Sequence, residues 1–137
     1  MRILHLTDLH FTSEIGKLTK QDKLISNFKK DLKLNVDNID FVIFSGDLVL
    51  NGSKSDDFNK AYKEFIESIL EILKINKKNF FICPGNHDVD RNEVSKSIIK
   101  YIDEELKSNE DVNIFFNTSK TDLVTSHLPL KNYRNFL

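Results

Sequence analysis

The feature that most constrains the fold of this chain is a set of three short apolar runs, each followed directly by a polar cluster. The runs are RILHL (Arg2 to Leu6), DFVIF (Asp40 to Phe44) and NFFIC (Asn79 to Cys83). Their consecutive apolar positions are typical of strands in a parallel sheet that is covered on both faces. We therefore expect three buried strands that run in the same direction.

Helical spacing appears after each of these runs. Between residues 56 and 74, apolar side chains recur three and four positions apart, which places them on one face of a helix. These residues are Phe58, Tyr62, Phe65, Ile66, Ile69, Leu70 and Leu73. The same spacing is found in Leu24, Phe28 and Leu32, and again in Val94, Ile98, Tyr101 and Ile102. The order βαβαβα predicts an α/β fold with a mainly parallel sheet.

Beyond Lys107 the pattern is less regular. A short strand over residues 123–125 and a helix that begins at Pro129 are both compatible with the sequence. The helix would place Leu130, Tyr133, Phe136 and Leu137 on one side. A surface helix with loops fits this stretch equally well.

The composition indicates a soluble protein of one domain. The length of 137 residues is common for a domain, and the net charge of −1 gives no reason to expect a membrane surface as a partner. Nucleic acid stays open only as a substrate. The N-terminus does not resemble a secretory signal. With Cys83 as its single cysteine the chain cannot form an internal disulfide, which fits a reducing compartment. We expect a cytoplasmic protein.

The polar clusters are regularly spaced along the chain. They are Thr7-Asp8-Leu9-His10, Ser45-Gly46-Asp47 and Gly85-Asn86-His87-Asp88. The separation is 39 residues both from Asp8 to Asp47 (47 − 8) and from Asp47 to Asn86 (86 − 47). Equal strand-and-helix units would bring all three clusters to one edge of the sheet. Ligands of open α/β sheets bind at the carboxyl ends of the strands, so this edge is the expected place for a site.

The residue types in these clusters favour a divalent metal ion. Asp8 and Asp47 would repel each other if they were close together without a cation. Mixed oxygen and nitrogen ligands suit Zn, Mn or Fe. Asp8 and His10 would share one face of an extended segment, because alternate residues of such a segment point the same way. Each cluster alone is an ordinary turn signal, and only their combination in this order indicates a metal site.

The stretches TDLH, SGDLV and PGNHD resemble the calcineurin-like metallophosphoesterases, whose pattern runs D-x-H, G-D and G-N-H-[DE]. The resemblance extends from Met1 to about Arg91. It implies the first half of a four-layer αββα sandwich, as one domain over residues 1–137 that is incomplete at its C-terminal end. It also implies a hydrolase of phosphate mono- or diesters that uses a two-metal centre and a bridging hydroxide.

The resemblance implies a role for each matching residue. Asp8 and His10 would bind the first of two divalent ions, which would be Mn, Fe or Zn. Asp47 would bridge both ions, and Asn86 would bind the second. His87 would be catalytic rather than a ligand: it would stabilise the transition state or protonate the leaving oxygen.

Several neighbouring residues have less specific expectations. Asp88 is expected to orient His87 by accepting its other N–H. His5 is expected to be a satisfied core or edge histidine, and Cys83 a buried small residue. Arg91 is either a phosphate contact or a surface residue at a helix start.

The sequence departs from the family pattern in its second half. No G-H-x-H occurs in the chain, and His127 is the candidate for the fourth block. The second sheet of the family fold is also missing, so an apolar face of the strands would need a partner chain, a dimer or the rest of a longer protein. Two alternatives to the enzyme therefore stay open. One is a non-catalytic remnant or interaction module, and the other is a protein that binds a single metal through Asp8, His10 and Asp47.

Overall fold

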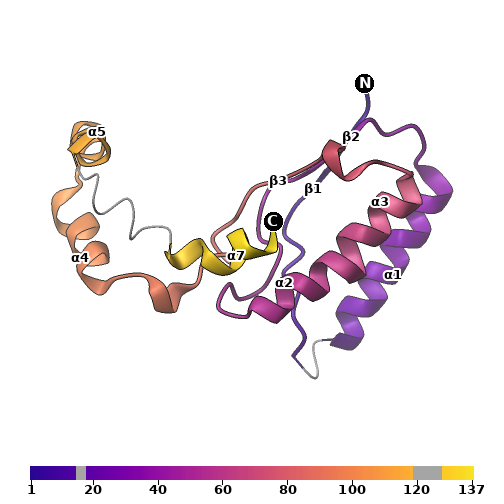
Figure 1. The fold of residues 1–137 in the computed structure, drawn as a ribbon, viewed down its shortest axis with the longest axis horizontal. Coiled ribbons are helices and arrows are strands. Elements are labelled where there is room, and N and C mark those ends of the chain that lie inside the picture. Colours follow the sequence, from indigo (N-terminus) through magenta and orange to yellow (C-terminus); the bar gives the residue numbers. More distant parts are fainter. Residues whose placement is uncertain (15–17, 119–127) are drawn as a thin grey trace.

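The computed structural model describes residues 1–14, 18–118 and 128–137. Three strands, β1 (Ile3–Leu6), β2 (Phe41–Phe44) and β3 (Phe80–Ile82), form one parallel sheet in the order β1-β2-β3. The strands alternate with helices along the chain, so the predicted α/β class and the parallel sheet are confirmed (Figure 1).

The sheet has one covered and one open face. Neighbouring residues in register share a face, so Leu6, Phe44 and Ile82 lie together and pack against the core. On the opposite face the described elements leave Ile3 45% and Phe81 52% exposed. The apolar runs predict strands that are covered on both faces, and the described residues cover one of them.

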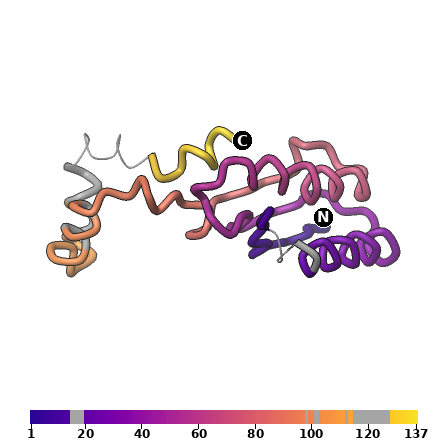
Figure 2. Tube along the Cα trace, turned by 90° about the horizontal axis from the view of Figure 1, so that it is seen from below, coloured from indigo at the N-terminus to yellow at the C-terminus, as the bar shows by residue number. Residues whose placement is uncertain are grey.

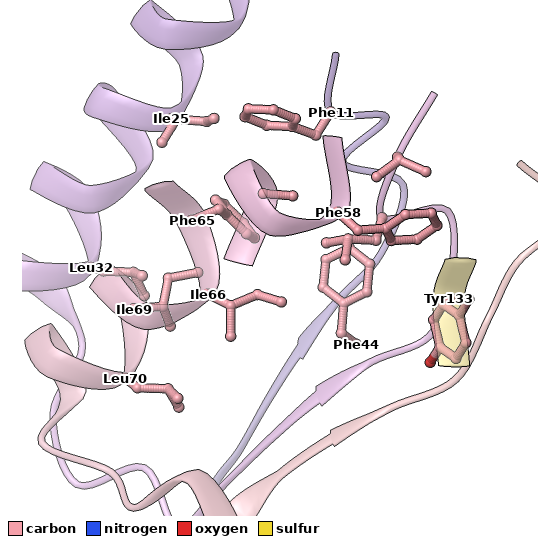
Figure 3. Close-up of a cluster of buried hydrophobic side chains, with 13 residues drawn as sticks. Phe11, Ile25, Leu32, Phe44, Phe58, Phe65, Ile66, Ile69, Leu70 and Tyr133 are labelled. Carbon is pink, nitrogen blue, oxygen red and sulfur yellow. The ribbon is translucent and has the colours of Figure 1, made fainter. Parts of the chain in front are cut away.

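The covering layer consists of α1 (Leu18–Asn35) and a second helical segment (Figure 1). This segment comprises α2 (Ser55–Ala61), a π-helical turn η1 (Tyr62–Glu67) and α3 (Ser68–Leu73), so the helix predicted from residue 56 to residue 74 is confirmed. Figure 3 shows the buried side chains of these helices as one cluster, to which the sheet contributes Phe44. The buried apolar residues that the helices contribute are Ile25, Leu32, Phe58, Ala61, Phe65, Ile66, Ile69 and Leu70.

The prediction that Leu24 of α1 belongs to the core is wrong. Leu24 is 61% exposed, whereas its neighbour Ile25 is 5% exposed and belongs to the core. A helix has about 3.6 residues per turn, so residues that are always four apart move gradually to another face of the helix. Ile25, Phe28 and Leu32 are three and then four apart, so they stay on one face. Phe28 is half-buried against the core and stacks on Phe65 at 5.7 Å between ring centroids.

The C-terminal third holds short helices. Two 3-10 turns, η2 (Lys77–Asn79) and η3 (Arg91–Glu93), flank β3, and α4 (Lys96–Glu105) and α5 (Asn109–Thr118) follow. In Figures 1 and 2, α4 and α5 extend away from the sheet. Of the predicted apolar face of α4, Val94 lies before the helix begins, and the side chains of Ile98, Tyr101 and Ile102 lie outside what the structure describes.

The chain returns to the sheet through η4 (Leu128–Leu130) and α7 (Lys131–Phe136), which packs on α2 (Figure 2). The helix predicted after Pro129 is therefore confirmed. Tyr133 is buried, whereas Leu137 is 62% exposed and does not share its environment. The strand considered at residues 123–125 and the candidate ligand His127 lie outside the described residues. None of the helices in the described ranges is both long and apolar enough to span a membrane.

Candidate metal centre

The loops that follow β1 and β2 remain hydrogen-bonded to each other beyond the strands. The backbone N–H of Asp8 donates to the Gly46 carbonyl at 3.0 Å, and that of His10 donates to the Asp47 carbonyl at 3.0 Å. Phe11 then forms an isolated parallel bridge with Val49. The first two polar clusters therefore lie side by side at the carboxyl edge of the sheet, as their spacing predicted.

Three residues of these loops have left-handed backbones. The φ angles are 58° for Asp8, 49° for His10 and 57° for Asp47. Such angles are uncommon outside glycine, although Asp and His tolerate them better than most residues, and they concentrate at functional sites. The expected extended conformation of Asp8 to His10 is therefore wrong, because the chain turns here to follow the second loop. The two side chains still meet, with 3.6 Å between Asp8 Oδ1 and His10 Nε2.

The third polar cluster is fixed to the second through Asp47. Its Oδ1 atom accepts a hydrogen bond from the backbone N–H of His87 at 2.8 Å. Gly85 lies so close that a Cβ atom there would be 2.1 Å from the same oxygen. The absence of a side chain at residue 85 therefore allows the loop after β3 to approach the Asp47 carboxylate.

His10, Asp47 and His87 form a group that could hold a metal ion. One ligand atom from each lies within 4.8 Å of the others, and all three residues are half-buried. The two imidazole rings meet edge to face, with 4.6 Å between their centroids. The Nδ1 atom of His10 is buried and has no hydrogen-bond partner among the described residues. Imidazole nitrogens and a carboxylate oxygen are ligands that suit Mn, Fe or Zn, so these donors fit a divalent cation.

The orientation of His87 comes from a backbone carbonyl. Its Nδ1 lies 3.0 Å from the carbonyl oxygen of Leu50. Because a carbonyl can only accept, Nδ1 carries a proton and Nε2 is the atom left for other chemistry. This backbone partner carries no signal in the sequence, since any residue type at position 50 supplies the same carbonyl.

Asp88 does not have the role expected from the sequence. Its carboxylate is fully buried and accepts hydrogen bonds from the backbone N–H groups of Leu48 (3.2 Å), Val49 (3.0 Å) and Gly85 (2.9 Å). The prediction that it orients the His87 ring is wrong, because its oxygens are occupied by backbone donors and Leu50 holds the ring. Asp88 instead ties the second loop to the third.

The other predicted site residues lie on the solvent side of this group. Asp8 is exposed, and its Oδ2 accepts from the Thr7 hydroxyl at 2.6 Å. Asn86 is exposed between Gly85 and His87, and its side chain makes no hydrogen bond to the residues that the structure describes. Its carboxamide is therefore available to a ligand, although no contact places it in the group.

The structure also describes His5 and Cys83, for which the sequence predicts no role in the site. His5 is bonded to the Ser45 hydroxyl, with 2.8 Å from Nε2 to Oγ, as expected for a satisfied edge histidine. Cys83 is exposed, so the expectation of a buried residue is wrong. It follows the last residue of β3, where the chain leaves the sheet.

One cavity of the described structure lies away from this group. It encloses about 520 Å³ between α1 and the second helical segment and is lined by Lys29, Lys30 and Lys33 among others. A second cavity of about 370 Å³ includes His87 in its wall. We place the site at the second cavity, because it adjoins the residues that can bind a metal.

A parallel sheet with an aspartate and two histidines gathered at its carboxyl edge defines an α/β protein with a group that could hold a metal ion. Comparison with known families makes this more specific. The calcineurin-like phosphoesterase family matches residues 1–135, and the chain belongs to this family.

Two curated relatives share part of the chain. One is the "Uncharacterized metallophosphoesterase-like protein YydB" of Bacillus subtilis (strain 168), which is 33% identical over 92 residues, or 66% of this chain and 18% of that protein. The other is the "Probable glycerophosphodiester phosphodiesterase GpdQ" of Arcobacter nitrofigilis, 33% identical over 92 residues, or 64% of this chain and 30% of that protein. The matches therefore span less than a third of either relative.

Proposed function

We propose that this chain provides the metal centre of a phosphoesterase that hydrolyses phosphate mono- or diesters. The observation that carries the proposal is the convergence of His10, Asp47 and His87, with an unpaired buried nitrogen on His10. Membership of the calcineurin-like phosphoesterase family supports the reaction class.

The ligand assignment follows the three loops. Asp8 and His10 would hold one divalent ion, Asn86 would contribute to a second, and Asp47 would serve both. Divalent ions in this place would lower the pKa of a bound water and neutralise charge on the phosphate oxygens. Without cations, the Asp8 and Asp47 carboxylates would repel a phosphoester, so the acidic residues make sense only as ligands.

His87 donates a proton to the leaving oxygen. The Leu50 carbonyl holds the Nδ1–H, which fixes the ring and leaves Nε2 to carry a proton to the leaving oxygen. The Asp47 carboxylate fixes the backbone of the same residue through its N–H. His87 is therefore positioned from both ends, as general acid catalysis requires.

A phosphodiester is the substrate class to test first. The Arcobacter relative bears the name of a probable glycerophosphodiester phosphodiesterase. We propose that this chain also acts on diesters.

The test is Mn²⁺ binding by calorimetry, followed by hydrolysis of bis(p-nitrophenyl) phosphate. Asp47→Asn keeps an oxygen that can accept from the His87 N–H but removes the charge, so it should abolish binding without unfolding the protein. Asp37→Asn, at an exposed ion pair with Arg2, is the matched control and should bind as the wild type does. Turnover that depends on Mn²⁺ and Asp47 supports the proposal. Binding that is indifferent to Asp47→Asn contradicts it.

A further inference from the structure

We propose that the cavity beside the metal centre binds the alcohol part of the phosphoester, and that this alcohol is small and hydroxylated. The inference rests on the proposed function, because it takes His87 as the group that protonates the leaving oxygen. The cavity encloses about 370 Å³, near the lower end of the range for small-ligand sites.

The position of His87 determines which part of the substrate enters the cavity. This residue lies beside the proposed metal ligands His10 and Asp47 and also lines the cavity. A leaving oxygen must come within hydrogen-bond reach of the ring to receive its proton. The carbon group attached to that oxygen then extends into the space that the ring borders, which is this cavity.

Arg91 supplies the positive charge in the cavity wall. This residue is exposed, and its guanidinium has no ion pair or hydrogen bond with the residues that the structure describes. Glu14 also lines the cavity, but its Oε1 lies 2.6 Å from Lys54 Nζ, which offsets its charge. A guanidinium without a protein partner offers several N–H donors to ligand oxygens.

Among the remaining lining residues, Asn51 and Asn92 offer polar groups that suit hydroxyls, whereas Leu50 and Val89 supply an apolar part of the wall. Asn51 uses its Oδ1 to accept from the N–H and hydroxyl of Ser53, at 3.1 and 2.9 Å, so its amide N–H groups stay available. The Asn92 carboxamide has no hydrogen bond to described residues and can both donate and accept, as hydroxyl groups do. No Phe, Tyr or Trp is among the described residues that line the cavity, so a base or aryl group would have no stacking partner there.

The experiment compares three ligands on the Zn²⁺-loaded chain by calorimetry and by NMR titration of its amide signals. The probes are glycerol 3-phosphate, phenyl phosphate and inorganic phosphate. The variant is Arg91→Gln, and the matched control is Arg134→Gln, an exposed arginine of α7 outside the cavity. Both substitutions are on the surface, so folding should be preserved.

We expect glycerol 3-phosphate to bind with a Kd about ten-fold below that of phenyl phosphate, and Arg91→Gln to remove this preference. Zn²⁺ and inorganic phosphate should bind the variant as they bind the wild type, and Arg134→Gln should change nothing. Equal or tighter binding of phenyl phosphate, or a preference that survives Arg91→Gln, would overturn the inference.

The result also separates this inference from the proposed function. If Zn²⁺ does not bind, the metal centre is refuted, and the titration is repeated on the metal-free chain. Shifts of the Asn51 and Asn92 amides with glycerol 3-phosphate, lost in Arg91→Gln, would then still support the cavity as a ligand site. Their absence would overturn it.

Discussion

The Asp47 carboxylate accepts a hydrogen bond from the backbone N–H of His87, with 2.8 Å between Oδ1 and N. A side chain proposed as a metal ligand therefore also joins the loop after β2 to the loop after β3. A substitution can separate the effect of the Asp47 charge from the effect of this hydrogen bond, because asparagine removes the charge but keeps an oxygen that can accept.

Asp47→Ala and Asp47→Asn should therefore differ in stability but not in metal binding. The alanine variant leaves the His87 N–H without its acceptor and should lose about 1–3 kcal/mol in the free energy of unfolding. The asparagine variant should lose less, because it retains an acceptor. Urea unfolding of both variants measures the difference, and equal stabilities would show that this hydrogen bond does not support the fold.

Asp88→Ala should be among the most destabilising single substitutions in the chain. It removes the buried acceptor of three backbone N–H groups, those of Leu48, Val49 and Gly85. We expect a loss of about 3 kcal/mol or more, since a buried donor left without a partner costs its full desolvation penalty. Asp37→Ala, at a surface ion pair, should cost less than about 1 kcal/mol in the same urea titration. Similar losses for the two variants would contradict the structural role of Asp88.

Gly85→Ala should impair both folding and metal binding. Its new Cβ atom would overlap the Asp47 carboxylate, which must move away, and overpacking of this kind typically costs about 1–3 kcal/mol. Asn86→Ala is the comparison one residue further on. It should leave stability within about 0.5 kcal/mol of the wild type and weaken metal binding about ten-fold or more. Thermal unfolding and Mn²⁺ calorimetry test the pair, and unchanged binding in Asn86→Ala would remove this residue from the ligand set.

Tyr133→Phe should stabilise the protein, and more so at high pH. The Tyr133 hydroxyl is buried without a hydrogen-bond partner among the described residues, so its removal should gain about 1 kcal/mol at neutral pH. Burial, with smaller contributions from Asp88 and Cys83, raises the pKa of this phenol above its ordinary value of about 10. Because this pKa is raised in the folded state, the phenol is neutral in both states below about pH 10 and costs no pH-dependent stability there. Above about pH 10 the unfolded chain loses the proton first, so stability falls as the pH rises toward the folded pKa.

The measurement is urea unfolding between pH 7 and 11, with Tyr62→Phe as the control on the same packing layer. The wild type and Tyr62→Phe should lose stability above about pH 10, whereas Tyr133→Phe should lose less. Parallel pH profiles for all three proteins would show that the Tyr133 phenol does not titrate on unfolding.

The sequence predicted the strands and the site edge well, because both depend on patterns that repeat along the chain. Equal spacing of Asp8, Asp47 and Asn86 brought the three loops to one edge, as expected for parallel strands. Periodicity also located the helices, although it misplaced Leu24, since a weak pattern allows a rotation of the helix by one residue.

The details of the site depended on backbone contacts that the sequence does not display. The left-handed turns at Asp8 and His10 arise because this loop pairs with the backbone of Gly46 and Asp47. In the same way, a carbonyl of Leu50 rather than a side chain orients His87. Asp88 was misread for this reason: its neighbour in sequence was His87, but its partners are backbone N–H groups.

The close packing of Gly85 also bears on how this chain could change over generations. Any side chain at residue 85 collides with Asp47, so a lineage that had stopped using metal would still need glycine there to fold. Asn86 has no such protection, because it is exposed and forms no hydrogen bond within the described structure. In a protein that no longer bound a metal ion, Asn86 could be substituted without loss of stability. Of the stretch PGNHD, the asparagine is thus needed by the proposed site alone, whereas the glycine serves both the fold and the position of Asp47.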